Sequence, residues 1–386
     1  MNKRVYFLMV IAFVVGIVEL IISGILDLIA EDLNVSLGQA GWLITVFALI
    51  FALMSPVLLV ATEKVERKRL MIICLWIFLL GNIITIFSPN YAIVFLGRVV
   101  TALSGALLTI LCLVMAPAMV EKQYKGRAIG IISMGVSGSL VLGIPIGLVL
   151  GNNFGWRAPF VMVAILTVIS IIGVHLWMNR VEPMKAVPLR TQIASLTNSK
   201  VTFALLTTFL YMSGHTALYA YLKPFLEETM ALNATMVSLI YFIFGLSAVS
   251  GGGIGGALAD NFGSRKTISI SLVLFIFTFI IIPFTTNLVP LFIIVSIVWG
   301  ILSWAISPAM QSYLIETSPK IASILQSLNN TALHLGVAAG SFFGGIIINI
   351  VPIVYNAFIG AILIFLSLIT AYISMHSKEK SPATIK

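Results

Sequence analysis

Charge is the scarcest feature of this sequence. Only 9% of its 386 residues are Asp, Glu, Lys or Arg, whereas 60% are hydrophobic and the mean hydropathy is +1.12. Soluble domains carry about 25% charged residues, so a water-soluble fold of this composition could not cover its own surface. The composition therefore excludes a soluble domain and predicts a chain solvated mostly by lipid.

Cysteine and histidine are also rare. The chain has two cysteines and four histidines, and their spacing matches no metal site, disulfide framework or nucleophile–base pair. Cys74 and Cys112 lie inside apolar stretches, where a thiol acts as a small hydrophobic side chain. The sequence therefore predicts no enzyme, no bound metal and no cofactor.

Long apolar runs are abundant. A run of about 18 or more apolar residues is long enough to cross a bilayer as a helix, which satisfies all its backbone polar groups internally. We expect an all-α membrane protein with twelve spans, near residues 5–28, 39–60, 70–88, 91–115, 128–150, 158–177, 201–222, 235–258, 267–285, 288–312, 321–348 and 353–375.

The basic residues are distributed unevenly between the loops. The net charge is +9, but Lys and Arg are scattered over short loops rather than gathered on one face, which argues against a nucleic-acid partner. The N-terminus and the tail carry Lys3, Arg4, Lys378, Lys380 and Lys386, and the even-numbered loops carry most of the others. The opposite loops hold essentially only Arg157 and Lys223. This asymmetry predicts that both termini are cytoplasmic. We expect a multi-pass protein of the inner or plasma membrane of a bacterial cell.

Residues 178–200 form the longest polar stretch. They predict a cytoplasmic linker between an N-terminal six-helix bundle, residues 1–177, and a C-terminal one, residues 201–386. Similar loops follow the second span of each half, 197 residues apart, at residues 63–68 and 260–266. Paired six-helix repeats with a substrate site near the midplane are an architecture of secondary transporters.

Two ionisable residues lie deep inside predicted spans. Glu19 interrupts the first span and Arg98 the fourth. Counted at 1.5 Å per residue, both lie roughly 10–14 Å from the outer surface. Ionisable groups at such depth are costly and usually functional. We predict that Glu19 and Arg98 couple transport to protons; a static structural ion pair is the alternative.

The fifth span is rich in glycine around a proline. Gly143, Pro145 and Gly147 would allow close helix packing and a bend. This segment resembles the antiporter signature of drug:proton exporters, although Ile144 separates the first glycine from the proline. Packing of small residues without any specific role is the alternative interpretation.

The loop after the eighth span contains Asp260, Gly263 and Arg265. This order of an acid, a glycine and basic residues resembles the loop signature of the major facilitator superfamily. In that family the acid meets a helix N-terminus, where the helix dipole favours negative charge, and locks the cytoplasmic side. We predict a conformational gate here, with a solvated loop as the alternative. In the first half Glu63 replaces the acid and Glu66 stands where glycine is expected.

Polar and aromatic residues recur inside the later spans, where such groups usually face the bundle interior. The predicted substrate cavity comprises His215, Tyr219, Tyr221, Trp299, Trp304, Gln311, Asn329 and Asn330. Rings and amides of this kind suit a flat heteroaromatic ligand. His215 could instead carry protons, and helix–helix hydrogen bonding with an aromatic belt is the structural alternative.

Several of these segments together carry a closer resemblance. Residues 63–70, 127–135, 214–229, 244–260 and 299–316 resemble the twelve-helix drug:proton antiporters of the major facilitator superfamily, in particular bacterial purine base and nucleoside efflux pumps. The resemblance implies two pseudo-symmetric six-helix halves and proton-driven export, by alternating access, of ribonucleosides and of purine bases such as hypoxanthine, adenine or guanine. We expect a monomer. A multidrug or arabinose-type sugar exporter is the alternative.

Overall fold

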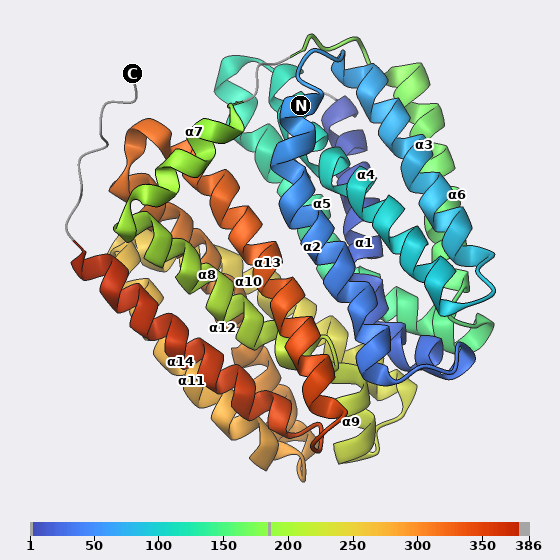
Figure 1. The fold of residues 1–386 in the computed structure, drawn as a ribbon, viewed down its shortest axis with the longest axis vertical. Coiled ribbons are helices and arrows are strands. Elements are labelled where there is room, and N and C mark those ends of the chain that lie inside the picture. Colours follow the sequence, from blue (N-terminus) through green and yellow to red (C-terminus); the bar gives the residue numbers. More distant parts are fainter. Residues whose placement is uncertain (1–2, 184–186, 378–386) are drawn as a thin grey trace. The chain divides into compact units, whose positions relative to one another are not determined.

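A computed structural model describes residues 3–183 and 187–377 (Figure 1). Lys378, Lys380 and Lys386 of the predicted basic tail, and residues 184–186 of the predicted linker, lie outside these ranges. In the described residues all regular structure is helical, and twelve helices are long and apolar enough to cross a membrane. The predicted all-α membrane fold is therefore confirmed.

The helices follow the predicted spans closely. In chain order they are α1 (Lys3–Asp32), α2 (Leu37–Ala61), α3 (Arg67–Ile86), α4 (Tyr91–Ala118), α5 (Lys125–Phe154), α6 (Ala158–Trp177), α7 (Leu189–Ala194), α8 (Ser199–Tyr219), α9 (Leu222–Met230), α10 (Ala234–Phe262), α11 (Ser264–Ile281), α12 (Val289–Thr317), α13 (Ala322–Ile348) and α14 (Tyr355–His376). Each of the twelve predicted spans overlaps one long helix.

The seventh span differs from its prediction. Instead of one helix over residues 201–222, α8 ends at Tyr219 and α9 begins at Leu222. Pro224 explains the break, because proline has no N–H to donate and its ring would clash with the carbonyl of Ala220, four residues earlier. The chain therefore starts a new short helix that carries proline in its first turn.

The chain folds into two units. Residues 3–183, together with Asn233–Phe242, form unit 1, and residues 187–232 and 243–377 form unit 2. In unit 1, α1 packs on α5, and α3 packs on α4 and α6. In unit 2, α8 packs on α13 and α14, and α11 packs on α12 and α14. The two units thus repeat one packing scheme, with α8 and α13 in the places of α1 and α5.

Glycines bring the central helix pair of unit 1 close together. A Cβ atom added at Gly143 of α5 would lie 3.3 Å from the Ile17 side chain of α1. One added at Gly147 would overlap the Ile21 side chain. Gly143 and Gly147 are four residues apart, and so are Ile17 and Ile21. Successive turns of α5 therefore pack against successive turns of α1.

Unit 2 repeats this contact with different partners. Gly340 and Gly344 of α13 lie 197 residues after the two α5 glycines. A Cβ atom at Gly344 would lie 2.6 Å from the Ala217 carbonyl oxygen of α8, and one at Gly340 would overlap the Ser213 carbonyl. The repeat seen in the loops therefore extends to the helix contacts.

Candidate functional site

Arg98 of α4 lies at the centre of unit 1. Its side chain is 0% exposed. Its Nη1 donates to the Val18 carbonyl of α1 at 2.7 Å, and its Nε donates to the Leu43 carbonyl of α2 at 3.3 Å. The guanidinium also lies 4.2 Å from the centroid of the Phe47 ring. One cation thus links three helices through two backbone carbonyls and an aromatic face.

Glu19 lies next to this guanidinium. It follows Val18 on α1, is half-buried, and its negative charge acts on Arg98. Arg98 Nη2 is buried and, within the described residues, has no hydrogen-bond partner. The structure therefore places the two ionisable residues at the same level of the bundle, with one guanidinium nitrogen, Nη2, not used in a hydrogen bond among the described residues. Their role in proton coupling stays a prediction.

The predicted antiporter helix is α5. Gly143 and Gly147 are buried against α1, as described, while Pro145 between them is half-buried and α5 continues through it to Phe154. These residues therefore set how closely α5 approaches the helix that carries Glu19. An antiport role beyond this packing stays a prediction.

Three predicted cavity residues gather in unit 2. Trp299 Nε1 donates to His215 Nδ1 at 3.0 Å, and the His215 ring stacks on Tyr219 with centroids 5.0 Å apart. Phe244 and Phe279 pack edge-on against the Trp299 ring at 5.1 and 5.3 Å. An accepting Nδ1 requires a neutral imidazole that carries its proton on Nε2. The result is a buried aromatic cluster with one polar edge.

The other predicted cavity residues lie elsewhere in unit 2. The Tyr221 hydroxyl donates to the Ser341 carbonyl at 2.7 Å, and Asn329 Oδ1 accepts from the Thr208 hydroxyl at 2.7 Å. Both side chains therefore join α13 to the α8–α9 segment. Trp304 is half-buried, and Gln311 and Asn330 are exposed.

The predicted gate residues lie where α10 meets α11. Gly263 has φ +87°, a conformation that favours glycine, and caps the start of α11, while Asp260 and Arg265 are exposed. The Ser264 hydroxyl donates to the Glu316 carboxylate of α12 at 2.8 Å. An acid on α12, which sequence reasoning missed, thus contacts the start of α11. The gate role of Asp260 stays a prediction.

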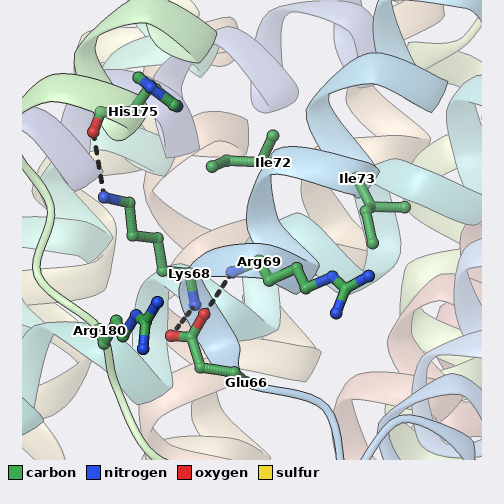
Figure 2. Close-up of a pocket in the computed structure, with 7 residues that line it drawn as sticks. All are labelled: Glu66, Lys68, Arg69, Ile72, Ile73, His175 and Arg180. Atoms are coloured by element: carbon green, nitrogen blue, oxygen red, sulfur yellow. Dashed lines mark hydrogen bonds between the residues drawn. The ribbon is translucent and has the colours of Figure 1, made fainter.

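The corresponding position in unit 1 is Glu66, 197 residues before Gly263. Its carboxylate caps α3 by accepting from the backbone N–H groups of Lys68 and Arg69, each at 2.8 Å (Figure 2). It also accepts from the Val181 N–H at 2.9 Å. Glu66 therefore fixes the start of α3 and ties it to the segment after α6. Glutamate is not a favoured cap residue, so the sequence analysis identified Glu66 only as a position where glycine is expected.

These hydrogen bonds set the charge state of Glu66. Burial raises the pKa of the carboxyl, but the Val181, Arg69 and Lys68 N–H groups and the Arg180 charge lower it, so that the pKa lies below its ordinary value of 4.5. Because folding lowers the pKa, the carboxylate stabilises the fold above pH 4.5. This stabilisation is lost as the pH falls through the lowered pKa of the folded state.

We therefore expect Glu66→Ala to lower the free energy of unfolding by about 0.5–2 kcal/mol at pH 7, the usual cost of losing a helix cap. Thermal unfolding of the purified protein in detergent measures this difference. The difference should shrink as the pH falls below 4.5 and through the lowered pKa of the folded state. Glu182→Ala, at an exposed acid, is the control and should leave unfolding unchanged. A pH-independent difference would show that the charge of Glu66 does not matter.

Comparison with known proteins identifies the family. A family model described as the Major Facilitator Superfamily matches residues 8–221 and 204–386. The chain belongs to this superfamily. Among its relatives, the uncharacterized MFS-type transporter YbcL of Bacillus subtilis is 30% identical over 377 residues, which cover 98% of this chain and 97% of the relative. The inner membrane transport protein YdhP of Escherichia coli is 28% identical, covering 97% and 95%.

The chain is also similar to a relative named as an exporter and to a protein of known structure. A probable sugar efflux transporter of Helicobacter pylori is 25% identical, covering 95% of this chain and 93% of the relative. The crystal structure of a bacterial homolog of the human lysosomal transporter Spinster, inward-facing and occupied, superposes with a TM-score of 0.82 at 16% identity, covering 99% and 98%. The predicted major facilitator fold is thus confirmed. This superfamily member is a multi-pass bacterial membrane transporter for small molecules; the narrower resemblance to purine pumps stays a prediction.

Proposed function

We propose that this transporter exports its substrate in exchange for protons. The observation that carries the proposal is the position of Arg98, fully buried between α1, α2 and α4 and under the influence of the Glu19 charge. An acid beside a buried guanidinium can be neutralised and restored as a proton binds and leaves. A relative that is named a probable sugar efflux transporter supports export as the direction of movement.

The proposed mechanism is alternating access, in which the substrate site opens to one side of the membrane at a time. Substrate enters from the cytoplasm, Glu19 takes a proton from outside, and the exchange resets the pump. Asp260, Gly263 and Arg265 would form the cytoplasmic gate. We also propose that a monomer acts, that both termini are cytoplasmic, and that residues 178–200 link its two bundles.

A purine base or nucleoside is our first choice of substrate. The buried cluster of His215, Tyr219 and Trp299 combines stacked rings with hydrogen-bonding groups, which are the side-chain types that suit a flat heteroaromatic solute. A sugar is the second choice, because the Helicobacter pylori relative is named a probable sugar efflux transporter.

Transport in proteoliposomes tests both parts of the proposal. We expect radiolabelled hypoxanthine and adenosine to move when a proton gradient is imposed, unlabelled purines to compete, and a protonophore to stop the movement. If arabinose moves and purines do not, the protein is an exporter but its substrate is a sugar. Purine movement that ignores both the gradient and the protonophore would contradict proton coupling.

A further inference from the structure

A pocket of about 280 Å³ opens on unit 1 where α3 begins and α6 ends. Figure 1 shows α3 and α6 side by side, and the two helices are in contact. The residues that line the pocket are Glu66, Lys68, Arg69, Ile72, Ile73, His175 and Arg180 (Figure 2). None of them belongs to the proposed coupling pair or to the aromatic cluster.

The polar part of this pocket carries excess positive charge. Lys68, Arg69 and Arg180 oppose one carboxylate, Glu66, whose oxygens already accept three backbone N–H groups. The Lys68 ammonium donates to the His175 carbonyl at 3.0 Å. In Figure 2 the Arg69 side chain extends away from Glu66, so its guanidinium is available to an external anion. Arginine pairs with phosphate through two parallel hydrogen bonds, so this composition suits a phosphate.

The other part of the pocket is apolar and continues along the helices. Ile73 is 43% exposed and is followed on the same face of α3 by Trp76, which is 57% exposed. At the end of α6, Leu176 and Trp177 are 67% and 60% exposed. An exposed tryptophan at a helix end, as Trp177 is, is typical of the membrane–water interface. A ligand in this pocket would therefore meet cations at one end and a lipid-facing surface at the other.

We propose that this pocket binds an anionic phospholipid of the leaflet at which α3 begins. The phosphate would pair with the Arg69 guanidinium, Lys68 and Arg180 would add positive charge nearby, and an acyl chain would follow Ile73 and Trp76. A free phosphate would use the cations but gain nothing from the apolar part, which is why we commit to a lipid. The bound lipid would bridge α3 and α6, reinforcing the contact that Lys68 and Glu66 already make. The proposal does not depend on the identity of the transported substrate.

Native mass spectrometry of the delipidated full-length protein tests the proposal. We expect one phosphatidylglycerol to bind per protein in preference to phosphatidylcholine. Arg69→Gln with Arg180→Gln should weaken this binding about tenfold or more, since each basic residue near a membrane surface contributes to the attraction of anionic lipid. The control is Lys125→Gln with Arg127→Gln, which removes the same charge from exposed residues at the start of α5 and should change binding less than threefold.

Two further measurements keep the test decisive. Ile73→Asp leaves the cations in place but puts a negative charge in the apolar part, and it should also weaken phosphatidylglycerol binding about tenfold. Phosphatidylglycerol should raise the melting temperature of the wild type and of the α5 control pair, but not of Arg69→Gln with Arg180→Gln. Equal weakening by both double variants, equal binding of the two lipids, or full displacement of the lipid by millimolar glycerol phosphate would overturn the proposal.

Discussion

Glu19→Gln is expected to remove the whole gradient-driven component of export. Glutamine has nearly the same shape as glutamate but neither gives up nor takes up a proton at neutral pH. The hydrogen bonds of Arg98 go to the Val18 and Leu43 carbonyls, so the substitution leaves them intact. The variant should therefore fold and still allow substrate to exchange down its own gradient. Uphill efflux from proteoliposomes with an imposed proton gradient measures the loss.

Asp27→Asn is the matched control for this experiment. Asp27 lies two turns beyond Glu19 on the same helix and is also half-buried, and the substitution makes the same chemical change. We expect this variant to retain gradient-driven export. If Glu19→Gln pumped uphill at the wild-type rate, the coupling role of Glu19 would be wrong, and the acid would be structural. Equal losses in both variants would point instead to a general effect of charge on α1.

Gly147→Val is expected to lower the free energy of unfolding by about 1–3 kcal/mol, as overpacking of a filled interior does. A Cβ at this position would overlap the Ile21 side chain, and valine adds two methyl groups beyond it. Because α5 and α1 meet turn by turn, separating them here would also displace the segment that bears Glu19. We therefore expect export to fall together with stability. Thermal unfolding in detergent and the proteoliposome assay measure the two effects.

Gly130→Ala provides the control on the same helix. A Cβ at Gly130 would meet no atom within 4 Å. Replacing a glycine by alanine at an unobstructed helical position is expected to stabilise by about 0.5–1 kcal/mol. If Gly147→Val lowers the free energy of unfolding and Gly130→Ala raises it, the loss at Gly147 comes from the contact with α1. A Gly147→Val protein that melts like the wild type would show that α1 and α5 are not closely packed.

The fold follows from the sequence to a large extent because lipid imposes simple requirements. Apolar runs of membrane length must become helices, and all twelve predicted spans overlap long helices. The break before Leu222 was missed because hydropathy does not register a helix break inside an apolar run. The restraint was visible in Pro224, since the backbone effect of proline reaches back four residues.

The sequence predicted how deep the site residues lie in the bundle, but not on which face of its helix each side chain lies. The rise of a helix fixes how deep Glu19 and Arg98 lie, so counting residues places them at one level. Counting does not tell which face a side chain occupies. Tyr221 and Asn329, for example, were predicted to line a substrate cavity, and their side chains make hydrogen bonds within unit 2. Phe244 and Phe279 were overlooked because a phenylalanine in an apolar span has the same sequence context whether it meets lipid or Trp299.

The two helix caps at Glu66 and Gly263 limit which parts of the repeated units can be exchanged. At the first position a long acidic side chain must reach back to the backbone of α3. At the second, φ of +87° disfavours any side chain. Copying either loop into the other unit would therefore fail at this residue, although the surrounding residues align. The two positions thus share a place in the repeat but differ in which residues they tolerate, and a substitution profile averaged over both halves would misjudge each.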